Sequence, residues 1–230
     1  MIRPPPRSTP LPFTTLFRQW LPLGYLEEYS AFSGTPTLPD LLALRSLSPQ
    51  IRQTCPVLDA PLSDRPLDLH FVGTLNRRRE LFFARNARWL SQYKCFWHIP
   101  PTGDPFLKGK GQALDTQAVV GLSRRSKILL NLHRDDLPYF EWHRLIFFGL
   151  WQNTLVLTEP CHDVPGLVAG KHYIACHADE LEDKVHWLLN TTEGQREAER
   201  VRQAGHEAIK ATLLGNEVMQ RMVAVMGGGV

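Results

Sequence analysis

The sequence predicts an α/β fold, a Rossmann-like doubly wound parallel sheet followed by C-terminal helices. Apolar runs over residues 67–73, 127–132 and 155–158 contain few or no polar interruptions, as expected for strands that are buried on both faces. Helical patterns separate these runs. Alternating strands and helices with short connections favour a parallel sheet. No internal repeat is visible along the chain of 230 residues.

The composition of the chain changes near residue 66. Residues 1–65 are rich in proline and contain too few periodic elements for a core, apart from a short helix expected over 40–47. We therefore expect a linker or the remnant of a truncated N-terminal domain. A strand over 67–73 then ends in glycine, and Asn76 can cap a helix over 77–92.

The remaining elements follow from apolar periodicity and from turn residues. A loop over 100–111 contains three glycines and three prolines. Strands are expected over 94–99, 127–132, 155–158 and 172–176. Helices are expected over 112–122, 140–151, 179–189 and 193–214, with a helical turn over 164–169 that Gly170 closes.

Composition narrows the class of protein. A hydrophobic fraction of 43% with 21% charged residues is ordinary for a soluble globular protein. The net charge of +3 is too small to imply nucleic acid, and the basic runs at 77–79 and 124–125 are expected to be solvated helix faces. Four widely spaced cysteines favour a reducing, cytoplasmic setting. No apolar stretch reaches the ~20 residues of a membrane span, while peripheral membrane attachment stays open.

Polar residues follow the first predicted strand, where the chain turns into a helix. Gly73 ends the strand, Asn76 stands at the helix start, and Arg78 lies in the first turn. Backbone N–H groups at a helix start attract anions, and an arginine there can add bidentate phosphate contacts. Neither a G-x-G-x-x-G nor a Walker pattern is present. The turn predicts a phosphate site, and an ordinary turn with surface arginines is the alternative.

Two further strands end in polar residues. Asn131 and His133 close the strand over 127–132, and Glu159 follows the strand over 155–158. Ligands of parallel sheets bind outside the carboxyl ends of the strands. His133 can donate a hydrogen bond to a substrate oxygen or act as a general base, and Glu159 can accept hydrogen bonds from ribose hydroxyls. A capping role for His133 and an exposed loop position for Glu159 are the alternatives.

Glu141 and Arg144 lie three residues apart and share one face of a helix. A carboxylate near a helix start is favoured by the macrodipole. Glu141 can therefore bind sugar hydroxyls while Arg144 pairs with a phosphate, and an intrahelical ion pair is the alternative. The adjacent His162 and Asp163 lack a spaced third ligand, so no metal site is expected.

Taken in order, four segments resemble the C-terminal half of bacterial GT-B glycosyltransferases of the CgeB-like, group 1 type. They are FVGTLNRRR at 71–79, KILLNLH at 127–133, ExxRL at 141–145 and LVLTE at 155–159. The likeness extends from about residue 67 to residue 205. In addition, LPLGY at 21–25 resembles the end of the family's interdomain crossing.

The resemblance implies a Rossmann-like domain over 66–190 that binds a nucleotide-sugar donor, followed by helices and a tail over 191–230. It implies an enzyme, a glycosyltransferase that transfers sugar to a glycan or other acceptor without a metal or other cofactor. His133 and Glu141 are the expected catalytic residues. The expected donor-binding residues are Gly73, Asn76, Arg78, Asn131, Arg144 and Glu159. Replacing Arg78 or Arg144 by alanine is expected to weaken nucleotide-diphosphate binding by about 1–3 kcal/mol.

The chain departs from the family at three points. One is the turn before the strand over 155–158, where the family has small residues and this chain has WQNT at 151–154. The family has two glutamates separated by seven residues, whereas Gly149 stands eight positions after Glu141. Almost all of the N-terminal domain, which holds most of the acceptor site, is also expected to be missing, and transfer requires an aligned acceptor. The alternative function is therefore a non-catalytic module that binds nucleotide or a protein partner, or that self-associates. Its expected interface is aromatic: Phe147, Phe148, Trp151 and Trp187.

A receiver-like or flavodoxin-like domain is a third possibility. A receiver has acidic residues after its first strand, where this chain has Gly73 and Thr74. The sequence therefore disfavours that class.

Overall fold

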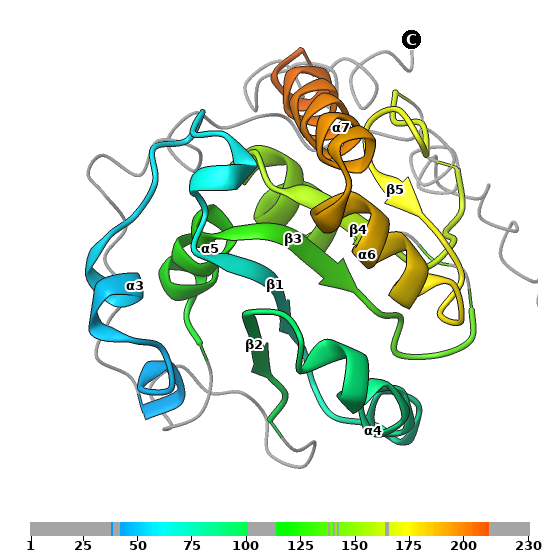
Figure 1. Ribbon diagram of the computed structural model, residues 1–230. Coiled ribbons are helices and arrows are strands. Elements are labelled where there is room, and N and C mark those ends of the chain that lie inside the picture. Colours follow the sequence, from blue (N-terminus) through cyan, green and yellow to red (C-terminus); the bar gives the residue numbers. More distant parts are fainter. Residues whose placement is uncertain are drawn as a thin grey trace, which may run out of the picture.

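The computed structural model describes residues 38, 42–100, 114–137, 139, 141, 143–163 and 166–211. At its centre is a five-stranded parallel sheet in the order β2-β1-β3-β4-β5 (Figure 1). The strands are β1 (Leu67–Val72), β2 (Cys95–His98), β3 (Ser126–Asn131), β4 (Leu155–Thr158) and β5 (Ile174–Ala175). The predicted Rossmann-like fold is confirmed, and each strand begins and ends within two residues of its predicted bounds.

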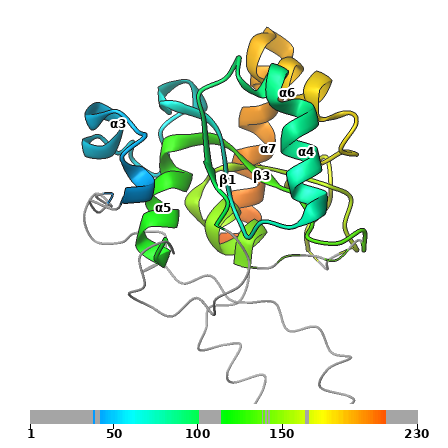
Figure 2. The same cartoon turned by 90° about the horizontal axis from the view of Figure 1, so that it is seen from below.

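Strand order reverses between β1 and β3, because the chain leaves β1 toward β2 and returns to the other side of β1. Helices cover both faces of the sheet. Figure 2 shows α4 (Arg77–Leu90) and α6 (Leu181–Asn190) on one face and α5 (Thr116–Arg125) on the other. In such a doubly wound sheet the reversal opens a crevice at the carboxyl ends of the two central strands, where ligands bind.

The core follows the alternation of side chains along each strand. Leu69 and Phe71 of β1 and Leu130 of β3 point toward α4 and α6, where they form the main apolar cluster. His70 points the other way and meets Ser123 of α5. The face that carries α4 and α6 is therefore fully apolar, whereas the α5 face contains polar groups.

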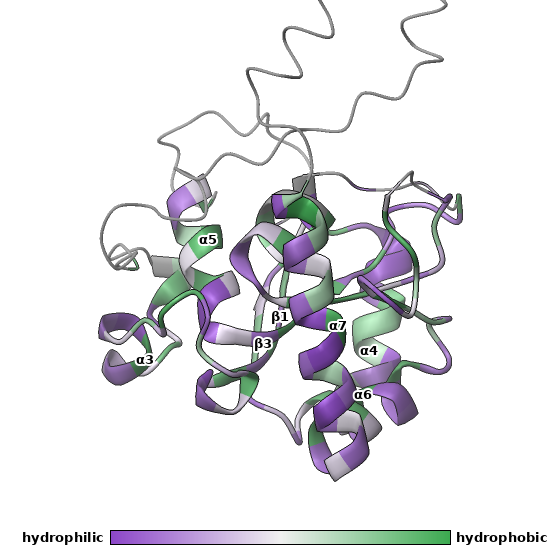
Figure 3. Ribbon diagram, turned by 90° about the horizontal axis from the view of Figure 1, so that it is seen from above, coloured by the Kyte–Doolittle hydropathy of each residue, from purple (hydrophilic) through white to green (hydrophobic). Residues whose placement is uncertain are grey.

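Three of the longer helices, α4, α5 and α7 (Thr192–Lys210), begin with a side-chain cap, whereas α6 does not. The Asn76 side chain accepts a hydrogen bond from the Arg79 backbone N–H, which confirms the predicted cap of α4. Asp115 caps α5 in the same way, and Thr191 caps α7. The first half of α7 joins the apolar cluster of α6, and Ile209 near its end packs beside β4. Hydrophilic residues are frequent on α6 and α7 in Figure 3.

Two segments differ from the predicted elements. The aromatic-rich helix expected over 140–151 is a π-helix, η3 (His143–Gly149), followed by a short 3-10 helix, η4 (Leu150–Gln152). A helical period alone does not distinguish π from α winding, because both place apolar residues on one face. The helical turn expected over 164–169 is wrong for the residues described there, since Ala169 forms an isolated bridge with Tyr173 around Gly170.

The expectation that the basic runs are solvated is also wrong in part. Arg79, Arg124 and Arg125 are buried, while Arg77 is exposed. Burial is tolerated because the guanidinium groups have hydrogen-bond acceptors, which are backbone carbonyls for Arg79 and Arg125 and the side-chain oxygen of Gln152 for Arg124. Arg125, for example, donates to the carbonyls of Ile51, Gly121 and Arg52 at 2.7, 2.9 and 3.1 Å.

Part of the proline-rich segment packs on the sheet. The described residues 42–66 contain two 3-10 helices, η1 (Leu42–Leu44) and η2 (Leu62–Asp64), and a short helix α3 (Pro49–Gln53). Leu44 and Leu47 join Phe96 and Leu122 in an apolar cluster under α5. The domain boundary at residue 66 stays a prediction, and the LPLGY segment lies outside the described residues.

No helix of the described residues has the length and apolarity needed to cross a lipid bilayer.

Candidate functional site

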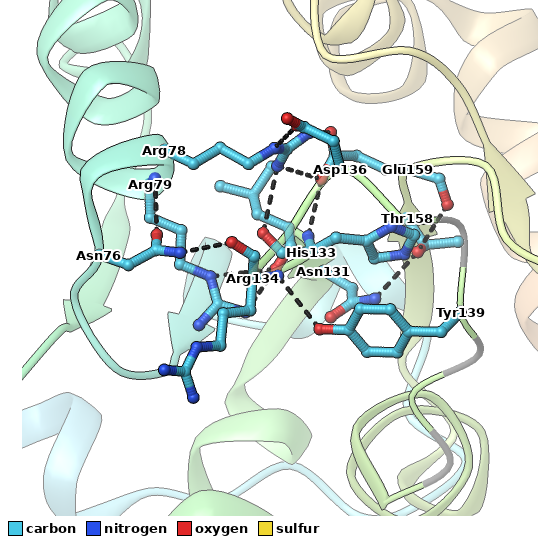
Figure 4. Close-up of polar contacts among 11 residues, drawn as sticks. Asn76, Arg78, Arg79, Asn131, His133, Arg134, Asp136, Tyr139, Thr158 and Glu159 are labelled. Carbon is cyan, nitrogen blue, oxygen red and sulfur yellow. Dashed lines mark hydrogen bonds and ion pairs between the residues drawn. The ribbon is translucent and has the colours of Figure 1, made fainter. Parts of the chain in front are cut away.

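The carboxyl ends of β1, β3 and β4 carry a dense group of polar side chains, which we name the strand-tip cluster. Figure 4 shows most of its members pointing toward one another from the start of α4 and from the ends of β3 and β4. The cluster consists of Asn76, Arg78, Arg79, Asn131, His133, Asp136, Tyr139, Glu141, Arg144, Thr158 and Glu159. Seven of the eight predicted site residues are among them, and Gly73 lies beside it.

Glu159, which follows β4, connects several members of the strand-tip cluster. Its carboxylate accepts two hydrogen bonds from Arg78, one at 2.8 Å from Nη1 and a shorter one from Nη2, and a third at 2.7 Å from the backbone N–H of His133. Arg78 also donates to Asp136 at 2.6 Å and to the His133 carbonyl at 3.1 Å. These contacts join α4 to the tips of β3 and β4, so Arg78 and Glu159 are partners of each other in this structure.

Arg79 joins the start of α4 to the tips of β1 and β3. It is buried and donates to the carbonyls of Leu132, at 2.7 and 3.2 Å, and of Thr74, at 3.1 Å. Asn76 donates from Nδ2 to the Arg134 carbonyl in addition to capping α4. Both residues therefore fix the loops around the site.

Arg144 extends from the π-helix back over β1. Its Nη1 donates to Asn131 Oδ1 at 3.2 Å and lies 2.9 Å from Glu141 Oε2, an ion pair not aligned as a hydrogen bond. The predicted pairing of Glu141 with Arg144 is therefore present. The guanidinium also lies over the Phe71 ring, 5.5 Å from its centroid. Gly73 permits this approach, because a Cβ there would lie 2.7 Å from Phe71 and 3.3 Å from Arg144 Nη2.

The His133 ring is stacked on Tyr139, with centroids 5.1 Å apart. Burial lowers the pKa of His133, against the opposite effect of the nearby Glu159 and Glu141 carboxylates. The ring is therefore neutral near pH 7, and its buried Nε2 has no hydrogen-bond partner among the described residues. A neutral imidazole can accept or donate one proton, the property required of the predicted acid or base.

A hollow of about 290 Å³ opens next to the cluster, between the tips of β1 and β3 and the start of α5. We name it the switch-point hollow, because it lies where the strand order reverses. Its described lining residues are His70, Val72, Gly73, Thr74, His98, Pro100, Leu114, Thr116, Val119, Leu129, Leu130, Arg144 and Phe148. Of the predicted site residues, the hollow is lined by Gly73 and Arg144.

Sequence reasoning missed the other polar residues of the hollow. They come from the middle of β1, the end of β2, the loop after β1 and the start of α5: His70, His98, Thr74 and Thr116. One signal was available, since His70 is a polar residue inside a mainly apolar strand. Burial lowers the pKa of His70 to about 3, so this ring is neutral at physiological pH.

Three of the four aromatic residues expected at an interface have described side chains, and that of Phe147 lies outside the described part. Trp151 is buried against Val156 and Ile209, and Phe148 lines the hollow. Trp187 packs on the main core beneath Lys184. The described residues contain no group of three or more His, Cys, Asp or Glu side chains arranged to hold a metal ion. Metal-free chemistry stays a prediction.

No protein-family model matches the sequence, and no curated protein is similar to it. Similar solved structures exist. One is the C-terminal domain of a group 1 family glycosyl transferase from Francisella tularensis, at 10% identity and a TM-score of 0.46, covering 66% of this chain and 94% of that one. Another is sucrose-phosphate synthase from Thermosynechococcus elongatus, at 12% identity and a TM-score of 0.52.

The second alignment covers 91% of this chain but 52% of the synthase, so the chain spans about half of that protein. At 12% identity the likeness concerns the fold alone. Together with the parallel sheet, it supports the expected Rossmann-like α/β fold, which the chain shares with about half of that synthase.

Proposed function

We propose that the protein is the donor-binding half of a glycosyltransferase and that a nucleotide-sugar binds in the switch-point hollow. The observation that carries the proposal is Arg144 on the wall of this hollow. Its Nη1 has acceptors in the strand-tip cluster, whereas neither Nη2 nor Nε has a hydrogen-bond partner among the described residues. An arginine with two donor nitrogens, Nε and Nη2, free to face a cavity is suited to bind a phosphate.

The lining of the hollow agrees with this ligand. The described lining residues include no Asp or Glu that would repel a diphosphate. Val72, Val119, Leu129 and Phe148 provide apolar wall for a flat base, and Thr74 and Thr116 provide hydroxyl groups. The volume of about 290 Å³ is near the lower limit for drug-sized ligands, roughly 300 Å³. It suits the nucleotide, with the sugar at the open side.

The same arrangement assists sugar transfer. When the bond between sugar and diphosphate breaks, negative charge develops on the leaving phosphate oxygen. A fixed guanidinium stabilises that charge without a metal ion, because its orientation is set before the reaction begins. In this proposal Arg144 touches the leaving group, and the remaining predicted donor-binding residues shape the loops around it. The glycan or other acceptor, the cytoplasmic location, and any self-association or membrane attachment stay predictions.

Calorimetric titration with UDP, GDP and their sugar conjugates tests the proposal. We expect at least one of them to bind, and Arg144→Gln to weaken that binding about 10- to 100-fold, the effect of losing a charged hydrogen bond. Arg88→Gln is the matched control, since Arg88 is an exposed arginine on the outer side of α4. Equal affinities for the wild type and Arg144→Gln would overturn the proposal.

A second candidate function is nucleotide binding without transfer. It is favoured by the burial of His133 and Glu141, which are 3% and 8% exposed and do not line the hollow. Neither predicted catalytic residue therefore reaches the hollow in this structure. An assay of donor hydrolysis and sugar transfer by the full chain separates the two functions. Tight UDP binding with no turnover of any nucleotide-sugar favours the binding module, and a dimer in gel filtration would support it further.

A further inference from the structure

Three groups determine the position of the Arg144 guanidinium. Asn131 Oδ1 and Glu141 Oε2 lie 3.2 and 2.9 Å from Nη1, and the Phe71 ring lies beneath the guanidinium plane. The opposite edge, formed by Nε and Nη2, has no hydrogen bond to any described residue and lies beside Gly73. The side chain is thus held on one edge and open on the other.

The orientation of Asn131 is itself fixed. Its Nδ2 donates to Thr158 Oγ1 at 3.0 Å, and the Thr158 hydroxyl donates its single proton to the Glu159 carbonyl at 3.0 Å. The hydroxyl can therefore only accept from Asn131, so the NH₂ group must face β4 and Oδ1 must face Arg144. The whole side chain is buried. This relay from Thr158 through Asn131 presents a defined acceptor to Arg144.

Glu141 lies between the buried Arg79 and the largely buried Arg144. Its carboxylate lies 2.9 Å from Arg144 and 3.8 Å from Arg79, and it accepts a hydrogen bond at 3.0 Å from the Tyr139 hydroxyl. Burial and the repulsion of Arg144 lower the pKa of Arg79 to about 10, so Arg79 remains charged at pH 7. Two positive groups thus share one carboxylate. Because Arg79 is turned to backbone carbonyls, the excess positive charge is available at the open edge of Arg144.

We propose that Asn131 and Glu141 are positioning residues, which hold the open edge of Arg144 toward an anionic group at the end of β1. They do not touch the ligand. This inference deepens the proposed function and rests on it, and it gives Glu141 a role other than that of a catalytic residue. It also gives Gly73 a reason to be glycine, since a Cβ there would overlap the Phe71 ring that supports Arg144 and would crowd Arg144 Nη2.

Removing the charge of Glu141 provides a test, because a positioning role and simple neutralisation predict opposite changes in anion affinity. If Glu141 only neutralised Arg144, Glu141→Gln would increase the positive charge at the hollow and tighten the binding of an anion. If Glu141 positions Arg144, the same variant weakens binding, because two guanidinium groups repel each other without a fixed partner between them. Asn131→Leu removes the second acceptor without changing any charge.

The experiment measures the dissociation constants of inorganic pyrophosphate, UDP and uncharged uridine for the full chain. For Glu141→Gln and Asn131→Leu we expect the constants for pyrophosphate and UDP to rise about tenfold, as for the loss of one charged hydrogen bond, while uridine binding is unchanged. Thr158→Val is the mild third variant, because it is nearly isosteric and lies one contact further from Arg144. It should give a smaller rise in the same two dissociation constants. It also tests the positioning role if Glu141→Gln or Asn131→Leu fails to fold.

The outcomes separate this inference from the proposed function. If Arg144→Gln leaves UDP binding unchanged, the proposed site is wrong and the positioning role is wrong with it. If Arg144→Gln weakens UDP binding while the folded Glu141, Asn131 and Thr158 variants bind all three probes like the wild type, only the positioning role is wrong. Tighter pyrophosphate binding by Glu141→Gln would likewise overturn it.

Discussion

Arginines with little solvent exposure occur at both ends of the sheet, and they differ in which groups accept their hydrogen bonds. At the amino end, Arg65 donates to the carbonyls of Ser123, Ser126 and Asn153 at 3.2, 3.1 and 2.6 Å. At the carboxyl end, Arg144 has acceptors for one edge of its guanidinium and lines a hollow with the other. Low exposure of an arginine therefore does not by itself indicate a binding site. N–H donors that face a cavity and have no described partner are a better indication, because a ligand can accept their hydrogen bonds.

The largest expected effect tests the amino end. Arg65→Ala removes donors from several buried backbone carbonyls and from Thr154 Oγ1, so we expect the free energy of unfolding to fall by about 3–5 kcal/mol. Urea denaturation measures this loss. The folded fraction should still bind UDP like the wild type. A loss of UDP affinity in folded protein would show that the two ends are coupled and would break the comparison.

Arg78→Ala tests whether the strand-tip cluster is structural or contacts the donor. Loss of the ion pair leaves the buried Glu159 carboxylate without its main partner, so the free energy of unfolding should fall by about 1–3 kcal/mol. The sequence also predicts weaker diphosphate binding. Calorimetry on the folded variant, with Glu159→Gln measured in parallel, separates the two effects. Unchanged UDP affinity would remove Arg78 from the donor-binding residues.

Stability should decrease in acid, because several histidines are buried without charge. Burial lowers the pKa of His70 to about 3, so the unfolded chain takes up this proton first as the pH falls through about 6.5. The contribution of neutral His70 to the free energy of unfolding is present above pH 6.5 and decreases as the pH falls toward 3. We expect this contribution to fall by about 2 kcal/mol between pH 7 and pH 5. Urea denaturation at both pH values measures it. A His70→Gln variant should show a shallower decrease, and an equal decrease would contradict the assignment.

The smallest effect is expected at the Lys127–Asp68 ion pair on the amino-end side. The two side chains are 25% and 16% exposed, and their charged atoms lie 2.7 Å apart. A partly solvated pair contributes little, so Lys127→Met should change the free energy of unfolding by no more than about 1 kcal/mol. UDP binding should not change. A larger loss of stability, measured by thermal denaturation, would show that solvent screens this ion pair less than the exposure of its two side chains indicates.

The sequence predicted the sheet well, because apolar runs such as residues 128–130, flanked by helical patterns, have few other solutions in a chain of this composition. It also predicted the Asn76 cap, which depends on neighbouring residues only. Burial of Arg124 and Arg125 was not predictable, since the carbonyl acceptors of Arg125 include those of Ile51 and Arg52, more than 70 positions earlier.

The candidate site was predicted in part for the same physical reason. Residues at strand ends, such as Asn131 and Glu159, meet because parallel strands end at one edge of the sheet. Which of them bind each other and which face a cavity depends on side-chain packing. The pairing of Arg78 with Glu159, across 81 positions, has no local signal. The hollow depends on the placement of α5 against β1, which no short motif encodes.

The wide winding of η3 has a consequence for the spacing of two residues that line the hollow. A π-helix closes its hydrogen bonds over five residues instead of four, so four residues span slightly less than one full turn. Arg144 and Phe148 are four residues apart in this segment, and both line the hollow. They therefore lie one above the other on the same face of η3, and this single turn presents a cation and an aromatic ring to the same cavity.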